Sequence, residues 1–366
     1  MTALLEERRV PATIGTRGVQ RMTTVLFVAA VLLAAYTGFR LPGDWAVTLE
    51  SVSLTDGFHR RFLIGTLLRP FALVFGYDYW VYAIAGFLVL GLLLAVLTVV
   101  FFRARTISKQ FLVIGWLLMP TGGFLFHEVG YFDQVLYLLL FGALCALNRG
   151  RLVLAGGLMV ASVLTHEIAL LTVIPVFGFA LLRKLPFRKA CAVLLPSAGT
   201  GLVLLALPAA APGAVQRFQQ VLADARFPFR DDAIGLFNRS QAESWGVYSI
   251  TDVLLYLLPI VVVVVAGFLL LHRPSLSALL SLAAILTPAL LAFGGWDEAR
   301  WGFLLITGFV MVLWIQLGDR ELGLPRFGAL AAILLILAQL PMPYFDGFQP
   351  REVTLVGTPH AVGAFR

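Results

Sequence analysis

The sequence predicts an all-α protein, a polytopic transmembrane helical bundle of about eleven spans. Hydrophobic residues make up 60% of the 366-residue chain and charged residues only 13%, whereas soluble domains carry about 25% charged residues. The mean hydropathy is +0.92. The charged residues separate long apolar segments, as they do when loops join membrane helices.

The formal net charge of +7 comes from basic residues that flank apolar segments. This pattern indicates membrane orientation rather than nucleic-acid binding. The predicted partner is the lipid bilayer, and we expect no nucleic acid. Cys145 and Cys191 lie in apolar segments, so we expect small buried residues without a disulfide.

The first 21 residues carry four arginines ahead of an apolar run at residues 22–39. The run is longer than the core of a signal peptide, and no clear cleavage site follows it. We therefore expect an uncleaved first span with residues 1–21 in the cytoplasm.

A first outer loop is predicted at residues 41–79. Its apolar part, residues 62–75, is too short to span easily and is broken by Arg69-Pro70. We expect a helix lying in the membrane interface, with Tyr77, Tyr79 and Trp80 at headgroup level.

Ten further spans follow within a single integral membrane domain, residues 1–366. The third span of the chain is interrupted by Pro120-Thr121-Gly122-Gly123. A large outer loop is predicted at residues 208–248, and an outer tail at 342–366. The predicted spans are 80–102, 111–126, 135–147, 152–164, a sixth ending at Arg183, 190–207, 250–271, 276–293, a tenth ending at Asp319, and 327–340.

With the N-terminus inside, all three lysines fall in cytoplasmic connections, which fits the positive-inside rule. Three of the five histidines, His59, His127 and His166, then share the outer face with several acidic clusters. The sequence therefore predicts one extracytoplasmic site at the mouth of the bundle.

Residues 56–65 bring an acid, an imidazole and two guanidiniums together. Asp56 is the first choice of catalytic base, and His59, Arg60 and Arg61 are predicted to bind substrate. Guanidiniums match phosphate geometry, and a carboxylate can take a proton from a hydroxyl. The alternative is a solvated loop that anchors to lipid phosphates.

Residues 127–134 place two carboxylates, Glu128 and Asp133, at the ends of neighbouring spans. They are predicted to be catalytic, with Tyr131 and Gln134 binding substrate. Such a pair can share a site, bind a cation, or divide into acid and base. A simple polar turn is the alternative.

Two further clusters complete the predicted substrate site. His166 and Glu167 interrupt a pair of apolar spans, where ionisable residues are costly. The other cluster comprises Trp296, Asp297, Glu298 and Arg300. Its tryptophan could stack on a sugar ring or belong to the interfacial belt, and Arg300 could pair with Asp297 within its helix.

This plan resembles that of the polytopic GT-C glycosyltransferases and related polysaccharide polymerases of bacterial envelopes. The shared features are the inner N-terminus, the long first outer loop with an acid and an interfacial helix, and acidic outer loops. Residues 56–65 are also similar to a segment of uncharacterised bacterial membrane proteins. The chain departs from the family in lacking an obvious Asp-x-Asp motif and a soluble C-terminal domain.

The resemblance implies a multi-pass enzyme of the bacterial inner membrane. Its donor would be a polyprenyl-phosphate-linked saccharide, and its acceptor an envelope glycan or lipid on the extracytoplasmic face. An outer-loop carboxylate acts as base in the family, and Asp56 takes that place here. The cofactor is unknown, and a divalent cation is left open.

Two other functions are consistent with the sequence. A transporter or flippase of a lipid-linked or anionic substrate is favoured by the interruption at residues 120–123. A metal-dependent lipid hydrolase is the other alternative. Its zinc ligands would come from His127, Glu128, Asp133, His166 and Glu167.

Overall fold

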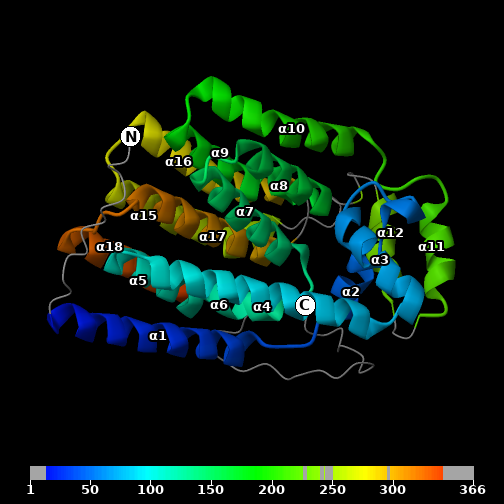
Figure 1. The fold of residues 1–366 in the computed structure, drawn as a ribbon, viewed down its shortest axis with the longest axis horizontal. Helices are drawn as coiled ribbons and strands as arrows, with labels where there is room; N and C mark the ends of the chain where they lie inside the picture. The colour runs from blue at the N-terminus through cyan, green and yellow to red at the C-terminus, as the bar shows by residue number, and fades with distance from the viewer. Residues whose placement is uncertain (1–13, 226–228, 240–242, 244–249, 295–296, 341–366) are drawn as a thin grey trace, which may run out of the picture.

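The computed structural model describes residues 14–225, 229–239, 243, 250–294 and 297–340. Within these ranges the chain is helical, with one isolated bridge between Phe58 and Ala210 and no strand. Figure 1 shows long helices running side by side, with α2, α3, α11 and α12 gathered at one end. We call this the capped end. The opposite end holds all three lysines and is called the lysine end.

The long helices alternate between the two ends, and short helices cover the capped end. The elements are α1 (Ile14–Gly38), α2 (Asp44–Glu50), η1 (Leu54–Asp56), α3 (Phe62–Phe75), α4 (Tyr79–Arg103), α5 (Ile107–Leu118), α6 (Pro120–His127), α7 (Phe132–Asn148), α8 (Leu152–Thr165), η2 (Glu167–Leu170), α9 (Val173–Lys184) and α10 (Phe187–Ala206). They continue with α11 (Ala214–Leu222), α12 (Asp231–Gly235), η3 (Leu236–Asn238), α14 (Ile250–Asp252), η4 (Val253–Leu257), α15 (Leu258–Leu271), α16 (Leu276–Leu286), η5 (Thr287–Phe293), α17 (Glu298–Leu317) and α18 (Leu324–Gln339).

Within the described ranges, six helical segments are long and apolar enough to cross a membrane, or seven if the bent pair α5 and α6 forms one span. The structure therefore contains a membrane-type bundle, but the predicted count of eleven is not confirmed. The reason is length. Helices α7, α8, α9 and α18 have 17, 14, 12 and 16 residues, fewer than the roughly 20 that a span needs.

The predicted interruption of the third span is present as a bend of 60° between α5 and α6. Pro120 opens α6 and has no N–H to donate to the preceding turn. The Thr121 hydroxyl instead donates to the carbonyl of Trp116. All eight residues of α6 are buried, so this broken segment lies inside the bundle.

Helix α17 is the central helix of the bundle. Of its most apolar window, 72% is buried, compared with 22–33% in the other five segments of spanning length. These outer segments expose rows of Leu, Val and Phe. Exposed apolar faces of this extent are typical of a surface that meets lipid.

Two loops of the cap are joined by a short antiparallel contact. The amide of His59 donates to the carbonyl of Ala209, and the amide of Ala211 donates to Gly57. Phe58 between them is fully buried. Its ring packs against Phe218 and Phe237 in the cap, so the loop before α3 and the large loop after α10 form one unit.

The predicted interfacial helix corresponds to α3. It exposes Leu67, Phe71, Leu73, Val74 and Phe75, and its position in the cap is visible in Figure 1. The predicted tail, residues 342–366, and residues 1–13 lie outside the described ranges.

The expectation of buried cysteines is wrong. Cys145 and Cys191 are free thiols, and both are exposed. Apolar sequence context predicted burial, but in a membrane bundle apolar segments also supply the outward face.

Candidate functional site

Among the described residues, three ion pairs at the capped end join an arginine to a carboxylate from a distant segment of the chain. The pairs are Arg40 with Glu128, Arg61 with Glu167, and Arg300 with Asp133. We call these six residues the ionic layer. Removing one partner of a buried pair leaves the other charge uncompensated, so either substitution is expected to destabilise the folded protein.

Arg61 donates three hydrogen bonds to Glu167, the longest from Nε to Oε2 at 3.4 Å. Its Nη2 lies 2.7 Å from Glu167 Oε1, and its Nε lies 3.1 Å from the same oxygen. Arg61 precedes α3 with φ at 56°, and among the described residues other than glycine no other φ is positive. Left-handed backbone costs free energy and is often found at functional sites.

His166 joins this pair because α8 ends there. The backbone at His166 is extended, with φ at −162° and ψ at 131°. Its Nδ1 lies 3.1 Å from Glu167 Oε2 and 3.3 Å from the amide of Ile168. The shorter distance and the charged acceptor favour Nδ1–H donating to Glu167. The break in the helix thus lets two adjacent side chains meet, which a regular helix would prevent.

The pKa values of this group reflect burial and one arginine. Burial, with Arg61 nearby, lowers the pKa of His166 to about 4, so its imidazole is neutral at pH 7. Burial opposes ionisation of Glu167, but Arg61 and His166 outweigh it and hold the pKa of Glu167 well below its usual value. Glu167 is therefore a fixed negative charge, unsuited to accept a proton at neutral pH.

Arg300 and Asp133 form a two-pronged pair, with Arg300 Nε 2.7 Å from Asp133 Oδ2 and Nη2 2.9 Å from Oδ1. The Asp133 side chain is only 2% exposed. Asp297 lies 4.0 Å from Arg300, so the predicted pairing within one helix is the weaker contact. The guanidinium also lies 5.7 Å from the centroid of the Tyr131 ring.

Glu128 lies between an arginine and a histidine. Arg40 Nη2 lies 3.3 Å from its Oε1, and His127 Nε2 lies 3.4 Å from the same atom. Arg40 Nε also donates to the carbonyl of His127 at 2.7 Å. Burial raises the pKa of Glu128 to about 7 although Arg40 opposes the rise. A carboxyl group with this pKa can both accept and release a proton at neutral pH.

Gln134 ties the beginning of α7 to the end of α6. Its Nε2 donates to the carbonyls of Leu125 and Glu128. Its buried Oε1 has no hydrogen-bond partner among the described residues. Gln134 therefore fixes the turn that carries Glu128.

Asp56 contacts Ser53 and Arg69 rather than the arginines of its own segment. Ser53 donates to its Oδ2, and Arg69 Nη2 lies 3.3 Å from its Oδ1. Arg69 comes from α3, just before Pro70. The acid of the 56–65 segment is therefore engaged by α3, while Arg61 of the same segment turns to Glu167. The catalytic role of Asp56 stays a prediction.

His59 and Arg60 contact the end of α10. Arg60 donates to the carbonyls of Leu204, Leu205 and Leu207 at 3.1–3.3 Å, and His59 Nδ1 lies 3.0 Å from the carbonyl of Pro208. An arginine at a helix C-terminus satisfies carbonyls that have no helical donor. Arg60 thus caps the C-terminus of α10, whereas Arg61 binds Glu167. The two guanidiniums have separate partners in this structure.

The fourth predicted cluster is described only in part. Trp296 lies outside the described residues, and Glu298 is placed only as the first residue of α17. Arg300 belongs to the ionic layer and Asp297 lies at its edge; their role in substrate binding stays a prediction.

Sequence reasoning missed three charged residues. Arg40, directly after the first apolar run, and Arg69, inside the interfacial helix, each pair with a predicted catalytic carboxylate.

The third missed residue is Glu50, which ends α2 and is 3% exposed. Burial raises its pKa well above the usual value, and its Oε2 has no hydrogen-bond partner within the described part of the chain. A side chain built at Gly130 would come within 3.9 Å of this oxygen, so Glu50 lies beside the turn that carries Glu128. A lone glutamate closing the apolar run of residues 46–49 was the available signal.

Among the described residues, no group of three or more His, Cys, Asp and Glu side chains is arranged to hold a metal ion. The five residues considered as zinc ligands are divided among arginine pairs instead. The hydrolase hypothesis therefore has no ligand set in this part of the chain.

Comparison of the chain with protein families, with characterised proteins and with solved structures finds no significant match.

Proposed function

We propose that the protein is a membrane glycosyltransferase that moves a sugar from a polyprenyl-phosphate-linked donor to an acceptor hydroxyl at the capped end. The observation that carries the proposal is Glu128, a buried carboxyl group with a pKa of about 7 beside an arginine at the edge of an apolar bundle. This combination supplies a base for a hydroxyl and a cation for a phosphate in one place.

In the proposed reaction, the acceptor oxygen attacks the anomeric carbon of the donor while Glu128 takes the hydroxyl proton. The bond between this carbon and the phosphate oxygen breaks, and polyprenyl phosphate leaves. Arg40 and Arg61 are 20% and 23% exposed, so they can meet a phosphate. Arg300, 14% exposed and bound through two atoms to Asp133, positions the layer.

The lipid part of the donor has a neighbouring surface. Helix α3 begins directly after Arg61, and its exposed face is made of Leu67, Phe71, Leu73, Val74 and Phe75. An apolar face beside a guanidinium fits a phosphate attached to a long hydrocarbon chain.

The test measures turnover of the purified protein in nanodiscs with a panel of polyprenyl-phosphate-linked sugars. The released polyprenyl phosphate is the product that is quantified. Because a positioned base contributes roughly 10²–10⁴-fold, Glu128→Gln should lower turnover by about that factor. Asp232→Asn is the matched control, because Asp232 is a half-exposed carboxylate of the cap that pairs with Arg230. Equal turnover in both variants would remove Glu128 from the reaction.

A transporter of the same lipid-linked saccharide is the second candidate. The bend in α5 and α6, inside the bundle, favours it, because broken helices build transport sites. Proteoliposomes separate the two functions. Movement of the donor across the bilayer without a new glycosidic product would favour transport, and a new product would favour the transferase.

A further inference from the structure

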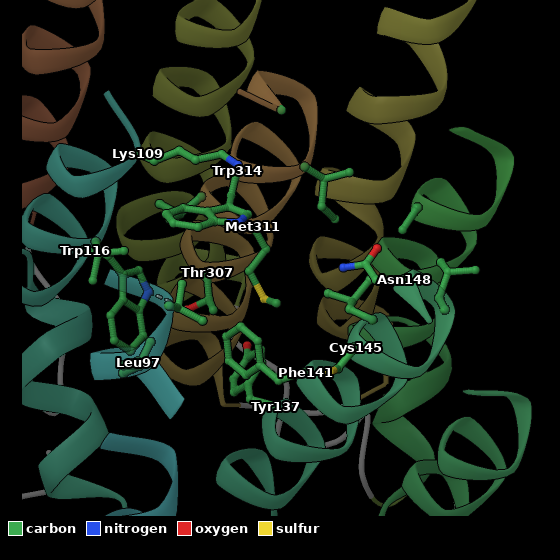
Figure 2. A pocket seen from close by; sticks show the side chains of 18 of the residues that line it. Leu97, Lys109, Trp116, Tyr137, Phe141, Cys145, Asn148, Thr307, Met311 and Trp314 are labelled. Atoms are coloured by element: carbon green, nitrogen blue, oxygen red, sulfur yellow. Dashed lines mark hydrogen bonds between the residues drawn. The ribbon is translucent and has the colours of Figure 1, made fainter. Parts of the chain in front are cut away.

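A cavity of about 670 Å³ lies inside the bundle, away from the ionic layer. Helices α4, α5, α7, α9 and α17 line it. Ligand sites for small molecules have volumes of about 300–1,000 Å³. Most of the lining is apolar, and Leu97, Phe141 and Met311 are examples that are labelled in Figure 2.

The two ends of the cavity differ in polarity. Trp116, Tyr137 and Thr307 are buried and lie away from Lys109 (Figure 2). Trp116 donates to the Thr307 hydroxyl at 3.0 Å. The other end is the lysine end, where the lining residue Asn148 is exposed. The cavity therefore opens toward the lysine end.

Three cations surround this opening: Lys109, Arg183 and Lys184. Lys109 Nζ lies 4.7 Å from the centroid of the Trp314 ring, and Lys184 Nζ donates to Asn148. Among the described residues, no carboxylate forms an ion pair with any of the three. Asp319, the one acid among the described lining residues, is 3.6 Å from Arg105 and also attracts the positive charge of Lys109, so the four charged lining residues carry a net positive charge.

We propose that this cavity binds an anionic phospholipid of the membrane, with its phosphate between Lys109, Arg183 and Lys184 and an acyl chain in the apolar interior. Lys109 is half-buried, whereas Arg183 and Lys184 are exposed, so the three cations can attract a phosphate at the edge of the apolar space. The apolar interior can accept a hydrocarbon chain. An anionic phospholipid carries both groups in one molecule. The site is at the opposite end from the ionic layer and is independent of sugar transfer.

The experiment uses two tryptophans of the cavity wall, Trp116 and Trp314, as reporters. The full protein is placed in phosphatidylcholine nanodiscs that contain brominated phosphatidylglycerol or, in parallel, brominated phosphatidylcholine. The same measurement on Trp314→Phe gives the part of the quenching that belongs to Trp314. We expect brominated phosphatidylglycerol to quench this part more strongly.

Charge contacts in partly dry sites are strong. Lys109→Gln and Lys184→Gln should therefore each weaken lipid binding, so that the lipid fraction at half-saturation rises by about tenfold. The matched control is Arg149→Gln, because Arg149 is an exposed cation of the lysine end that does not line the cavity. Val310→Phe keeps all three cations and fills the interior, so it should also abolish the excess quenching.

Three results would overturn the proposal. Equal quenching by the two brominated lipids would show that no anionic headgroup is selected. Equal loss in Arg149→Gln would show a general surface-charge effect. Displacement by inorganic phosphate alone, with unchanged binding in Val310→Phe, would show a site for a small anion and not for a lipid.

Discussion

Glu128 shows at the scale of one residue how burial and a nearby cation set a proton affinity. Burial alone would keep its carboxyl group neutral, and Arg40 limits that effect. If Glu128 is the base, its unprotonated form is active, so kcat/KM should rise with pH up to about 7 and then level off. One pH unit below this midpoint, kcat/KM should be about tenfold lower than its plateau at high pH.

The same measurement on Arg40→Gln tests the cause. Because Arg40 lowers the pKa of Glu128, removing its charge should move the midpoint to higher pH. A profile that stays flat between about pH 5 and about pH 8 in the unaltered protein would contradict the assignment of Glu128 as base.

Glu50 makes a separate prediction about stability. Burial holds the pKa of Glu50 in the folded protein well above its usual value, so above that usual value the native state binds more protons than the unfolded state. The free energy of unfolding therefore falls as pH rises through this range. Glu50→Gln removes this loss and should stabilise the protein at about pH 8 by about 1–3 kcal/mol, with a smaller gain at about pH 5.

Thermal unfolding of both proteins in the same detergent, at both pH values, measures the difference. Asp232→Asn is the control of opposite sign, because Arg230 holds the pKa of Asp232 below its usual value. Asp232→Asn should give no gain at the higher pH. A gain of equal size at both pH values for Glu50→Gln would mean that ionisation is not the cause.

At the scale of elements, Gly65 sets how closely α3 approaches the chain after α2. A Cβ at Gly65 would collide with the carbonyl oxygen of Val52 and would lie 2.7 Å from that of Glu50. Alanine normally improves a helix by about 1 kcal/mol over glycine. Here we expect Gly65→Ala to destabilise by about 1–3 kcal/mol, because backbone cannot yield as a flexible side chain does.

Gly91 in α4 is the matched control, because a Cβ there meets nothing within 4 Å. Gly91→Ala should leave the melting temperature unchanged or raise it slightly. If Gly65→Ala and Gly91→Ala have the same melting temperature, α3 does not pack closely against the backbone of Val52 and Glu50.

The elements also show what sequence can and cannot predict. The break before α6 could be predicted, because Pro120 and the glycines after it act locally. The helix in the first outer loop was predicted from its length and composition. The partners of Arg60 and Arg61 could not be predicted, since they lie 106 to 147 residues further along the chain. For the same reason the sequence placed Arg61 with Asp56, whereas the fold places it with Glu167.

The whole molecule separates its charges between the two ends of an apolar bundle. At the capped end, each arginine of the ionic layer has a carboxylate partner. At the lysine end, three cations around the cavity have none among the described residues. Paired charges can position reacting groups, and unpaired cations can hold an anionic headgroup. The two proposed activities of the protein therefore belong to opposite ends and can be tested separately.

The final prediction concerns which end faces the cytoplasm. If the N-terminus is inside, as the distribution of lysines indicates, the capped end is extracytoplasmic. Single cysteines at Gln216 in α11 and at Ser277 in α16 test this, because both positions are exposed and lie at opposite ends. The background is Cys145→Ala with Cys191→Ala, since both native thiols are exposed. An impermeant maleimide should label Gln216→Cys in intact cells and Ser277→Cys only after the membrane is opened. The reverse pattern would place the ionic layer in the cytoplasm, where the proposed transfer on the outer face could not occur. Protection of both positions in intact cells would also contradict an extracytoplasmic cap.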